Sequence, residues 1–311
     1  MERAVWVGVD GGGTHTIALV GDCAATDGLR VLGRGEAGPA NPQAVGYDTS
    51  ATTIATAIRR AVAQSGLEQP RLTRVTLGIA GASRANDRLR LGKLLAGQLG
   101  VAFEEVQVVA DTALILPAAG FASGVALIAG TGSAAYGVGR DGRVALAGGW
   151  GYLIGDDGSG FAIGREALRA VLRADDDLSP ATGLAEAFAA SLGVSQPRDL
   201  IRVIYQAESP RAAIAELAPL VAETARTGDE IAREILDRAG QDLAHIAVSV
   251  ARRLGLGADA PVVGAGGMFQ AGDVFAASLR ADLARQGLPN FRLLDAAPAL
   301  GALRLAMERT N

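Results

Sequence analysis

Cysteine and histidine are nearly missing from this 311-residue sequence, which has Cys23 alone and only two histidines, His15 and His245. One cysteine cannot form a disulfide within the chain, nor can it supply the thiolates of an iron–sulfur cluster or a cysteine-ligated zinc. We expect His15 to face solvent and His245 to be an ordinary helix residue. Sites that depend on sulfur ligands within one chain are therefore excluded.

An excess of positive charge is also missing, since 29 lysines and arginines stand against 33 aspartates and glutamates. The formal charge of −4 argues against binding to nucleic acid or to an anionic membrane, so a small-molecule partner is expected. The uncharged run 112–130 contains Pro117 and three glycines, which favours a helix followed by a strand over a membrane span. The start MERAVWVGVD carries acids too early for a signal peptide, and a cytoplasmic protein is expected.

Two segments share one plan, in which a β-rich run is followed by a turn of small residues and a second β-rich run. They are VWVGVDGGGTHTIALVGD (5–22) and GVALIAGTGSAAYGVGRDGRVALAGG (124–149). Strand and helix patterns alternate along the rest of the chain, which predicts an α/β fold. The length suits two domains, which we place at 1–113 and 114–296, with a final helix at 297–311 that could pack back on the first domain.

The first of these turns is rich in glycine but matches neither standard phosphate loop. The pattern GxxxxGK[ST] is absent, and a strand rather than a helix follows the glycines. Glycines can adopt positive φ and let a phosphate approach the backbone, where several N–H groups meet one anion; a plain hairpin turn is the alternative. Asp10, at the end of the first strand, is a candidate to hold Mg²⁺ through a water molecule. The candidate phosphate-binding residues are Gly11, Gly12, Gly13, Thr14 and Thr16.

Two later turns extend this pattern. IAGTGS (128–133) places small residues after a strand, so two hairpins can hold the phosphates of one nucleotide. VVGAGGMF (262–269) adds a third glycine turn, which suits close packing against a base and ribose. The candidate nucleotide-binding residues in these turns are Gly130, Thr131, Gly132, Ser133, Gly264, Gly266 and Gly267.

The order of the three turns resembles the actin-like and hexokinase-like ATP-binding superfamily. Within it, the chain resembles the N-acetylglucosamine kinase family, in the branch of the BadF/BadG/BcrA/BcrD ATPases. Four further stretches carry the resemblance: GPANP, GIAGA, VVADTA and GGWGYLIGDDGSGFAIG, of which the last is the most specific. The resemblance implies two actin-like (ribonuclease H-like) ATPase domains with an interdomain cleft, ATP and Mg²⁺ as cofactors, and a homodimer.

Matching the motifs residue by residue implies roles for individual side chains. Asp111 of VVADTA would orient the acceptor hydroxyl and take its proton, and capping of the following helix is the alternative. Asp157 is the alternative to Asp156 as the sugar-binding acid, and Trp150 could instead be a packing residue. The residues implied to contact the sugar are Asn41, Gly81, Asp111, Gly149, Trp150 and Asp156.

The function expected from this resemblance is ATP-dependent transfer of the γ-phosphoryl group to the 6-hydroxyl of an amino sugar. N-acetylglucosamine is the first choice, with glucosamine and N-acetylmuramic acid as alternatives, because no motif fixes the substituents at C2 and C3. An activator of a 2-hydroxyacyl-CoA dehydratase or benzoyl-CoA reductase is disfavoured, since a dimer would supply two cysteines against the usual four cluster ligands. A sugar-binding regulator without activity is the third hypothesis.

Overall fold

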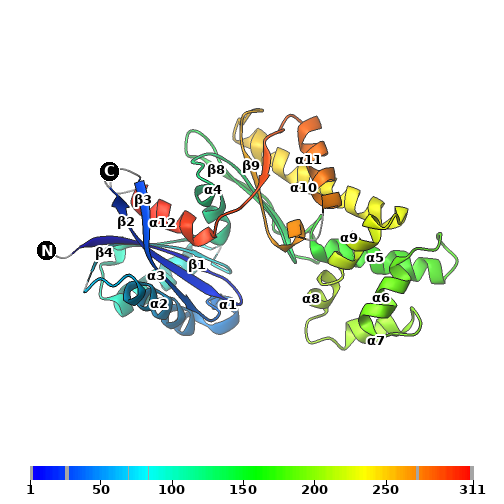
Figure 1. Ribbon diagram of the computed structural model, residues 1–311, viewed down its shortest axis with the longest axis horizontal. Coiled ribbons are helices and arrows are strands. Elements are labelled where there is room, and N and C mark those ends of the chain that lie inside the picture. Colours follow the sequence, from blue (N-terminus) through cyan, green and yellow to red (C-terminus); the bar gives the residue numbers. More distant parts are fainter. Residues whose placement is uncertain (1–2, 25–27, 69, 83, 271–272, 309–311) are drawn as a thin grey trace. The chain divides into compact units, whose positions relative to one another are not determined.

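The computed structural model describes residues 3–24, 28–68, 70–82, 84–270 and 273–308, and the chain divides into two compact units (Figure 1). The first unit comprises Met1–Ala122 and Leu294–Asn311, and the second comprises Ser123–Leu293. The first boundary between the units therefore follows residue 122, nine residues later than the position after residue 113 expected from the sequence. The second boundary follows residue 293 rather than residue 296. The short helices after Asp111 pack against the last helix of the first unit, which explains the later boundary.

The first unit is built on a five-stranded mixed sheet in the order β3–β2–β1–β4–β5. The first three strands are antiparallel neighbours, whereas β4 and β5 run parallel to β1. Gly11 pairs with Thr16 across the first turn, so the predicted first hairpin is confirmed. The strands are β1 (Ala4–Gly11), β2 (Thr16–Ala24), β3 (Gly28–Ala37), β4 (Arg71–Ile79) and β5 (Val106–Ala110).

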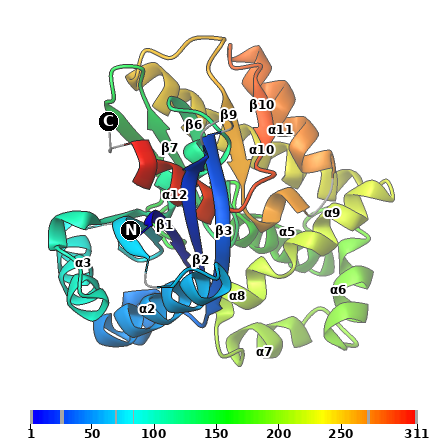
Figure 2. The same cartoon turned by 60° about the vertical axis from the view of Figure 1, so that its left-hand side comes forward.

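Helices cover both faces of this sheet. Alternate β1 residues such as Val7 face the core under α2 and α3, which lie side by side in Figure 2. On the other face, α12 returns to β1 and buries Leu303 against Leu19 (Figure 1). A side chain at Gly8 would overlap with the backbone of Leu303, so this glycine allows α12 to approach the strand that carries Asp10. The helices are α1 (Pro42–Val45), α2 (Tyr47–Gln64), α3 (Ala85–Leu99), η1 (Phe103–Glu105), η2 (Asp111–Leu114), α4 (Ile115–Ala118) and α12 (Pro298–Glu308).

The second unit repeats this sheet strand for strand. Its order is β10–β9–β6–β7–β8, with β6, β7 and β8 antiparallel and with β9 and β10 parallel to β6. The strands are β6 (Gly124–Ala129), β7 (Ser133–Val138), β8 (Val144–Gly148), β9 (Val262–Ala265) and β10 (Phe291–Leu293). The two similar sequence segments are therefore the first hairpins of two sheets with the same topology.

The core of the second unit lies between its sheet and a layer of helices. The long helix α10 packs against β6, β7 and β8, and α11 runs along α10. One face of α10 is apolar and packs against the core, with Leu243 and Val250 buried and Ile231 partly buried. The helices are α5 (Gly160–Asp175), α6 (Leu184–Leu192), α7 (Asp199–Tyr205), α8 (Pro210–Ala215), α9 (Ala218–Arg226), α10 (Glu230–Arg253), η3 (Gly267–Gln270) and α11 (Asp273–Arg285).

The uncharged run 112–130 forms η2, α4 and β6, so the expected helix followed by a strand is confirmed. Among the helices that the structure describes, none has both the length and the apolar character needed to span a bilayer.

Candidate active site

The first glycine turn exposes backbone N–H groups. Gly12 N donates to His15 O at 2.9 Å, which closes the hairpin, and Ala40 N donates to Gly12 O at 3.0 Å. In the described part of the chain, the amides of Gly13, Thr14 and His15 donate to no acceptor. Adjacent free amides of this kind can bind an anion, and Thr14 adds an exposed hydroxyl. The turn therefore has the donors that a phosphate group requires.

Thr16 differs from Thr14 in its surroundings. Its side chain is fully buried, and its hydroxyl donates to Gly38 O at 2.8 Å. The expectation that this hydroxyl faces a phosphate is therefore wrong, because the hydroxyl is already used inside the fold. The bond ties the start of β2 to the GPANP segment. Gly11 is also buried, and a Cβ there would lie 2.6 Å from Cδ1 of Ile79.

Two carboxylates lie at the same edge of the first sheet. Asp10 occupies the carboxyl end of β1, and Asp111 directly follows the parallel strand β5. Burial and the neighbouring charge of Asp111 raise the pKa of Asp10 to about 6. Burial also raises the pKa of Asp111, partly offset by hydrogen bonds from backbone N–H groups. The sheet edge thus holds two half-buried acids whose charges repel each other.

Helix capping does not account for Asp111. The residue at the N-cap of η2 is Ala110, which has no side chain able to accept a hydrogen bond. The Asp111 carboxylate instead accepts from Thr112 N at 2.9 Å, which is the next amide rather than one in the first turn. The Asp111 carboxylate is therefore not committed to capping the helix.

Asn41 and Gly81 come from different motifs but lie together in the first unit. Asn41 Oδ1 accepts from Gln43 N at 2.9 Å and caps α1, while no described acceptor binds its amide nitrogen. Gly81 has φ of +80°, and a Cβ there would overlap with the Asn41 side chain. Only glycine leaves room for that side chain. Ser83, two positions after Gly81 in the sequence, lies outside the described residues.

The second glycine turn is fixed by the loop and helix that follow β8. Gly160 N donates to Gly130 O at 2.8 Å, and Gly130 N donates to Gly132 O at 2.9 Å. The amides of Thr131 and Gly132 have no acceptor within the residues described, and the Thr131 side chain is exposed. This turn also offers free N–H groups to an anion.

Ser133, like Thr16, differs from the expectation that it contacts a phosphate, because its donors are already used inside the fold. Its N–H donates to Asp156 Oδ1 at 3.4 Å, and its hydroxyl donates to Asp157 O at 2.7 Å. The side chain is buried, so neither donor is free for a phosphate. Gly149 N donates to Ser133 O at 2.9 Å, which adds another link between the turn and the loop after β8.

Asp156 is the buried acid of the GGWGYLIGDDGSG segment, and Asp157 is exposed. Asp156 has φ of +61°, a conformation that aspartate tolerates better than most residues. Its Oδ2 accepts from Arg211 Nη2 at 3.1 Å. Trp150 is 73% exposed, so the alternative of a packing residue is wrong, and its indole ring is free to contact a ligand. Ser159 caps α5 by accepting from Ala162 N at 3.2 Å.

Arg211 was not among the residues expected from the sequence. No motif surrounds it, and it lies in the short helix α8, more than fifty residues after Asp156 in the chain. Its guanidinium carbon is 5.3 Å from the ring centre of Tyr152, which lies in the same loop as Trp150. Only the folded structure reveals the contact.

The third glycine turn lies against the second. Gly266 has φ of +118°, and a Cβ there would overlap with the backbone of Ala129, the last residue of β6. A Cβ at Gly264 would lie 2.9 Å from the ring of Phe291, whereas the position of Gly267 is open. These glycines let the start of η3 approach the strand that leads into Gly130. The second and third predicted nucleotide turns are thus neighbours in the second unit.

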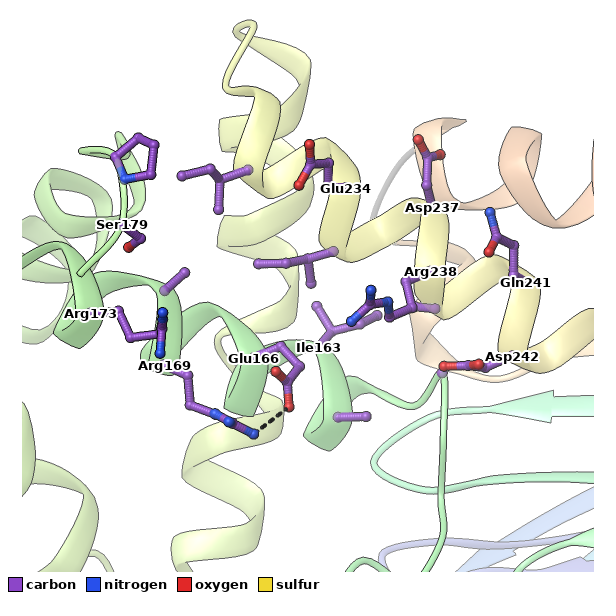
Figure 3. A pocket seen from close by; sticks show the side chains of 17 residues that line it. Ile163, Glu166, Arg169, Arg173, Ser179, Glu234, Asp237, Arg238, Gln241 and Asp242 are labelled. Atoms are coloured by element: carbon purple, nitrogen blue, oxygen red, sulfur yellow. Dashed lines mark hydrogen bonds and ion pairs between the residues drawn. The ribbon is translucent and has the colours of Figure 1, made fainter.

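A groove of about 660 Å³ lies elsewhere in the second unit, between α5 and α10 (Figure 3). Charged side chains of both signs line it, including Glu166, which pairs with Arg169 at 3.5 Å. Burial and the charge of Asp157 raise the pKa of Asp242 on its rim. The groove contains none of the residues predicted to bind the sugar or the nucleotide, so we do not assign the chemistry to it.

The predicted site residues divide between the units. The first unit contains Asp10, the first turn, Asn41, Gly81 and Asp111, and the second contains the other two turns and the loop with Trp150 and Asp156. No group of three or more histidine, cysteine or acidic side chains in the described part could hold a metal by itself. The carboxylates of Asp10 and Asp111 nevertheless fit Mg²⁺, which is commonly bound by one or two carboxylates together with phosphate oxygens and water molecules.

Known proteins with similar sequences cover the whole chain. Residues 7–306 match the sequence model of the BadF/BadG/BcrA/BcrD ATPase family. The chain is 30% identical over 321 residues to the N-acetyl-D-glucosamine kinase of Dictyostelium discoideum, with 99% of each protein covered. It is also 30% identical over 241 residues to the N-acetylmuramic acid/N-acetylglucosamine kinase of Clostridium acetobutylicum, with 76% of each covered.

A solved structure of similar fold comes from Chromobacterium violaceum and is provisionally named an N-acetylglucosamine kinase. It has 29% sequence identity and a TM-score of 0.72, covering 98% of this chain and 99% of its own. The similarity therefore extends through both units.

Proposed function

Because the chain belongs to the BadF/BadG/BcrA/BcrD ATPase family, we propose that it is an ATP-dependent amino-sugar kinase acting on N-acetylglucosamine. The observation that carries the proposal is Asp111, a half-buried carboxylate of raised pKa that follows a parallel strand beside Asp10. Both relatives at 30% identity are named as kinases of N-acetylglucosamine, which supports this substrate.

Asp111 acts as the general base in the proposed reaction. Its raised pKa makes the carboxylate a stronger proton acceptor than an exposed aspartate. The sugar 6-hydroxyl gives its proton to Asp111 as its oxygen bonds to the γ-phosphorus. The bond between that phosphorus and the β,γ-bridging oxygen breaks, and ADP leaves.

We assign the phosphates of ATP to the free amides of the two hairpin turns. Gly13 and Thr14 supply donors in the first unit, and Thr131 and Gly132 supply them in the second. The third turn, with open space at Gly267, suits the adenosine. The hydroxyls of Thr16 and Ser133 take no part, because each already has an acceptor within the fold.

Mg²⁺ is assigned to Asp10, with contact through water. A carboxylate whose pKa is raised by burial and by a like charge gains most from a nearby cation. When bound, the ion neutralises part of the phosphate charge. Asp10 itself contributes a fixed negative charge at the end of β1, directly before the first turn.

The sugar is assigned to Asn41, whose amide nitrogen beside Gly81 is free to donate. Asp156 is assigned from the resemblance: it is buried and each of its oxygens already accepts one hydrogen bond, but a carboxylate oxygen can accept a second. Gly149 and the exposed ring of Trp150 supply the wall. N-acetylmuramic acid is the second candidate substrate, because one relative is named for both sugars. The homodimer and the cytoplasmic location stay expectations from the resemblance, to be measured by light scattering and cell fractionation.

A coupled ADP-release assay tests the function. The purified protein is given Mg-ATP with N-acetylglucosamine, N-acetylmuramic acid, glucosamine, glucose or no sugar. We expect turnover with N-acetylglucosamine and a loss of about 10²–10⁴-fold in kcat for Asp111→Asn, because removing a general base has effects of that size. Retained ATP binding in the variant is the control for folding. ADP release that ignores the sugar, or full activity of Asp111→Asn, contradicts the proposal.

A further inference from the structure

The two hairpin turns contain no lysine or arginine. Residues 10–16 read DGGGTHT and residues 130–133 read GTGS, so His15 is their one basic side chain. A triphosphate carries several negative charges, and its transfer concentrates charge on the γ-phosphoryl oxygens. The proposed site therefore needs a cation from another part of the chain, besides a metal ion.

Arg211 lies directly against the second turn. A Cβ built on Gly132 would be 2.9 Å from Arg211 Nη2 and 2.7 Å from Asp156 Oδ2. The guanidinium thus lies beside the residue whose N–H is free to bind a phosphate. It also contacts the acid that the resemblance assigns to the sugar.

The guanidinium is held in place without being fully used. Its contacts are the hydrogen bond to Asp156 and the face of Tyr152, whose ring packs edge-on against Phe161 at 5.1 Å. The buried Nε has no partner among the described residues, although the side chain as a whole is 40% exposed. A guanidinium has five N–H donors, and one of them makes the hydrogen bond recorded here. The remaining N–H groups of its two Nη atoms can bind an anion.

On the basis of the proposed function, we propose that Arg211 binds the γ-phosphoryl group of ATP. In the reaction the γ-phosphoryl group must contact both the phosphate-binding turn and the sugar hydroxyl. Arg211 contacts Asp156, which is assigned to the sugar, and lies beside Gly132 of the second phosphate-binding turn. The planar guanidinium matches two phosphate oxygens at once. Asp156 aims the guanidinium and neutralises it when no γ-phosphate is bound.

Calorimetric titrations with Mg-ADP and with Mg-AMPPNP, an ATP analogue whose β,γ-bridge is nitrogen, test this role directly. We expect Arg211→Gln to weaken AMPPNP binding by about 10–100-fold while ADP binding changes less than about threefold, because the lost charged hydrogen bonds involve the terminal phosphate. Arg211→Lys should restore part of the difference, since lysine keeps the charge but not the planar fork.

Arg165→Gln is the matched control. Arg165 also stacks on an aromatic ring, Phe161, at 5.9 Å and pairs with an acid, Glu166, but it does not contact a glycine turn. Its loss should leave the ratio of AMPPNP to ADP affinity unchanged.

Four results would overturn the inference. An equal loss of ADP and AMPPNP binding with a lower melting temperature would show a structural role. A rise in sugar KM alone would show that Arg211 only positions Asp156. If the wild type is active and Arg211→Gln has the same ratio of AMPPNP to ADP affinity as the wild type, this inference is rejected and the proposed function is left intact. If the wild type binds neither nucleotide, both the inference and the proposed function are rejected.

Discussion

The two units share one sheet topology but place different side chains around it. In each, three antiparallel strands are followed by two strands parallel to the first, and the first hairpin carries a glycine turn. The insertions after the third strand differ. Two helices, α1 and α2, separate β3 from β4, while six helices, α5 to α10, separate β8 from β9 among the described residues.

The surroundings of the two turns differ more than the turns do. The first turn has free amides beside Asp10 and Asp111, both acids with raised pKa. The second turn also has free amides, but Asp156 and the start of α5 fix it, and a cation, Arg211, lies against it. In the proposed reaction, free backbone amides that bind phosphate are thus combined with a general base and a metal site in the first unit and with a cation in the second.

Of the changes that would test this difference between the units, removal of the charge of Asp10 has the largest expected effect on stability. Its folded pKa of about 6 lies above the ordinary 3.8, so the folded state binds more protons than the unfolded state between these values. Stability therefore falls as pH rises through this window, and the loss is complete above about pH 6. Asp10→Asn should stabilise the metal-free protein at pH 7.5 by up to about 3 kcal/mol, with no gain below about pH 4. Urea unfolding of the wild type and the variant in EDTA, at pH 7.5 and at about pH 4, measures this difference in stability.

Asp141→Asn is the control for Asp10→Asn, because Arg143 lowers the pKa of the exposed Asp141 in the second unit. That variant should not gain stability at pH 7.5. A destabilised Asp10→Asn at pH 7.5, or a gain that is the same at both pH values, would contradict burial and repulsion by Asp111 as the causes of the raised pKa of Asp10. Turnover should fall in Asp10→Asn although the protein is more stable.

A methyl group added to each turn gives the next largest effect. At Gly132 it would lie 2.7 Å from Asp156 Oδ2 and 2.9 Å from Arg211 Nη2, whereas at Gly13 it would meet no atom within 4 Å. Gly132→Ala should therefore destabilise the second unit by about 1–3 kcal/mol, a usual result of overpacking. Gly13→Ala should leave the melting temperature unchanged. Calorimetry of both variants measures the contrast, and equal melting temperatures would show that the second turn is not fixed as described.

Much of the fold follows from the sequence because its signals are local. The run of apolar residues before GGGT, the glycine turn and the alternating residues after it predict a hairpin, and β1 and β2 form it. The same pattern predicts β6 and β7. The helical spacing around Leu243 likewise marks the buried face of α10. These elements need no long-range information to be recognised.

The site was less predictable because a sequence pattern does not show which polar groups are already bonded. Thr14 and Thr16 look equivalent in the turn, but the strand alternation points Thr16 into the interior, where Gly38 O accepts its hydrogen. Ser133 is similarly taken up by the loop after β8. Arg211 had no local signal, since only folding brings it to Gly132.

The smallest expected effect separates these equivalent-looking hydroxyls. Thr16→Val leaves Gly38 O without its donor, which should cost about 1–3 kcal/mol of stability and change nucleotide affinity by less than about twofold. Thr14→Ala should weaken ADP binding and leave the stability unchanged, because the exposed Thr14 hydroxyl has no partner in the described fold and is free for a phosphate. Urea unfolding and ADP titration of both variants test this. If Thr16→Val weakened ADP binding without loss of stability, the buried hydroxyl would belong to the nucleotide site after all, and the first turn would have to rearrange on binding.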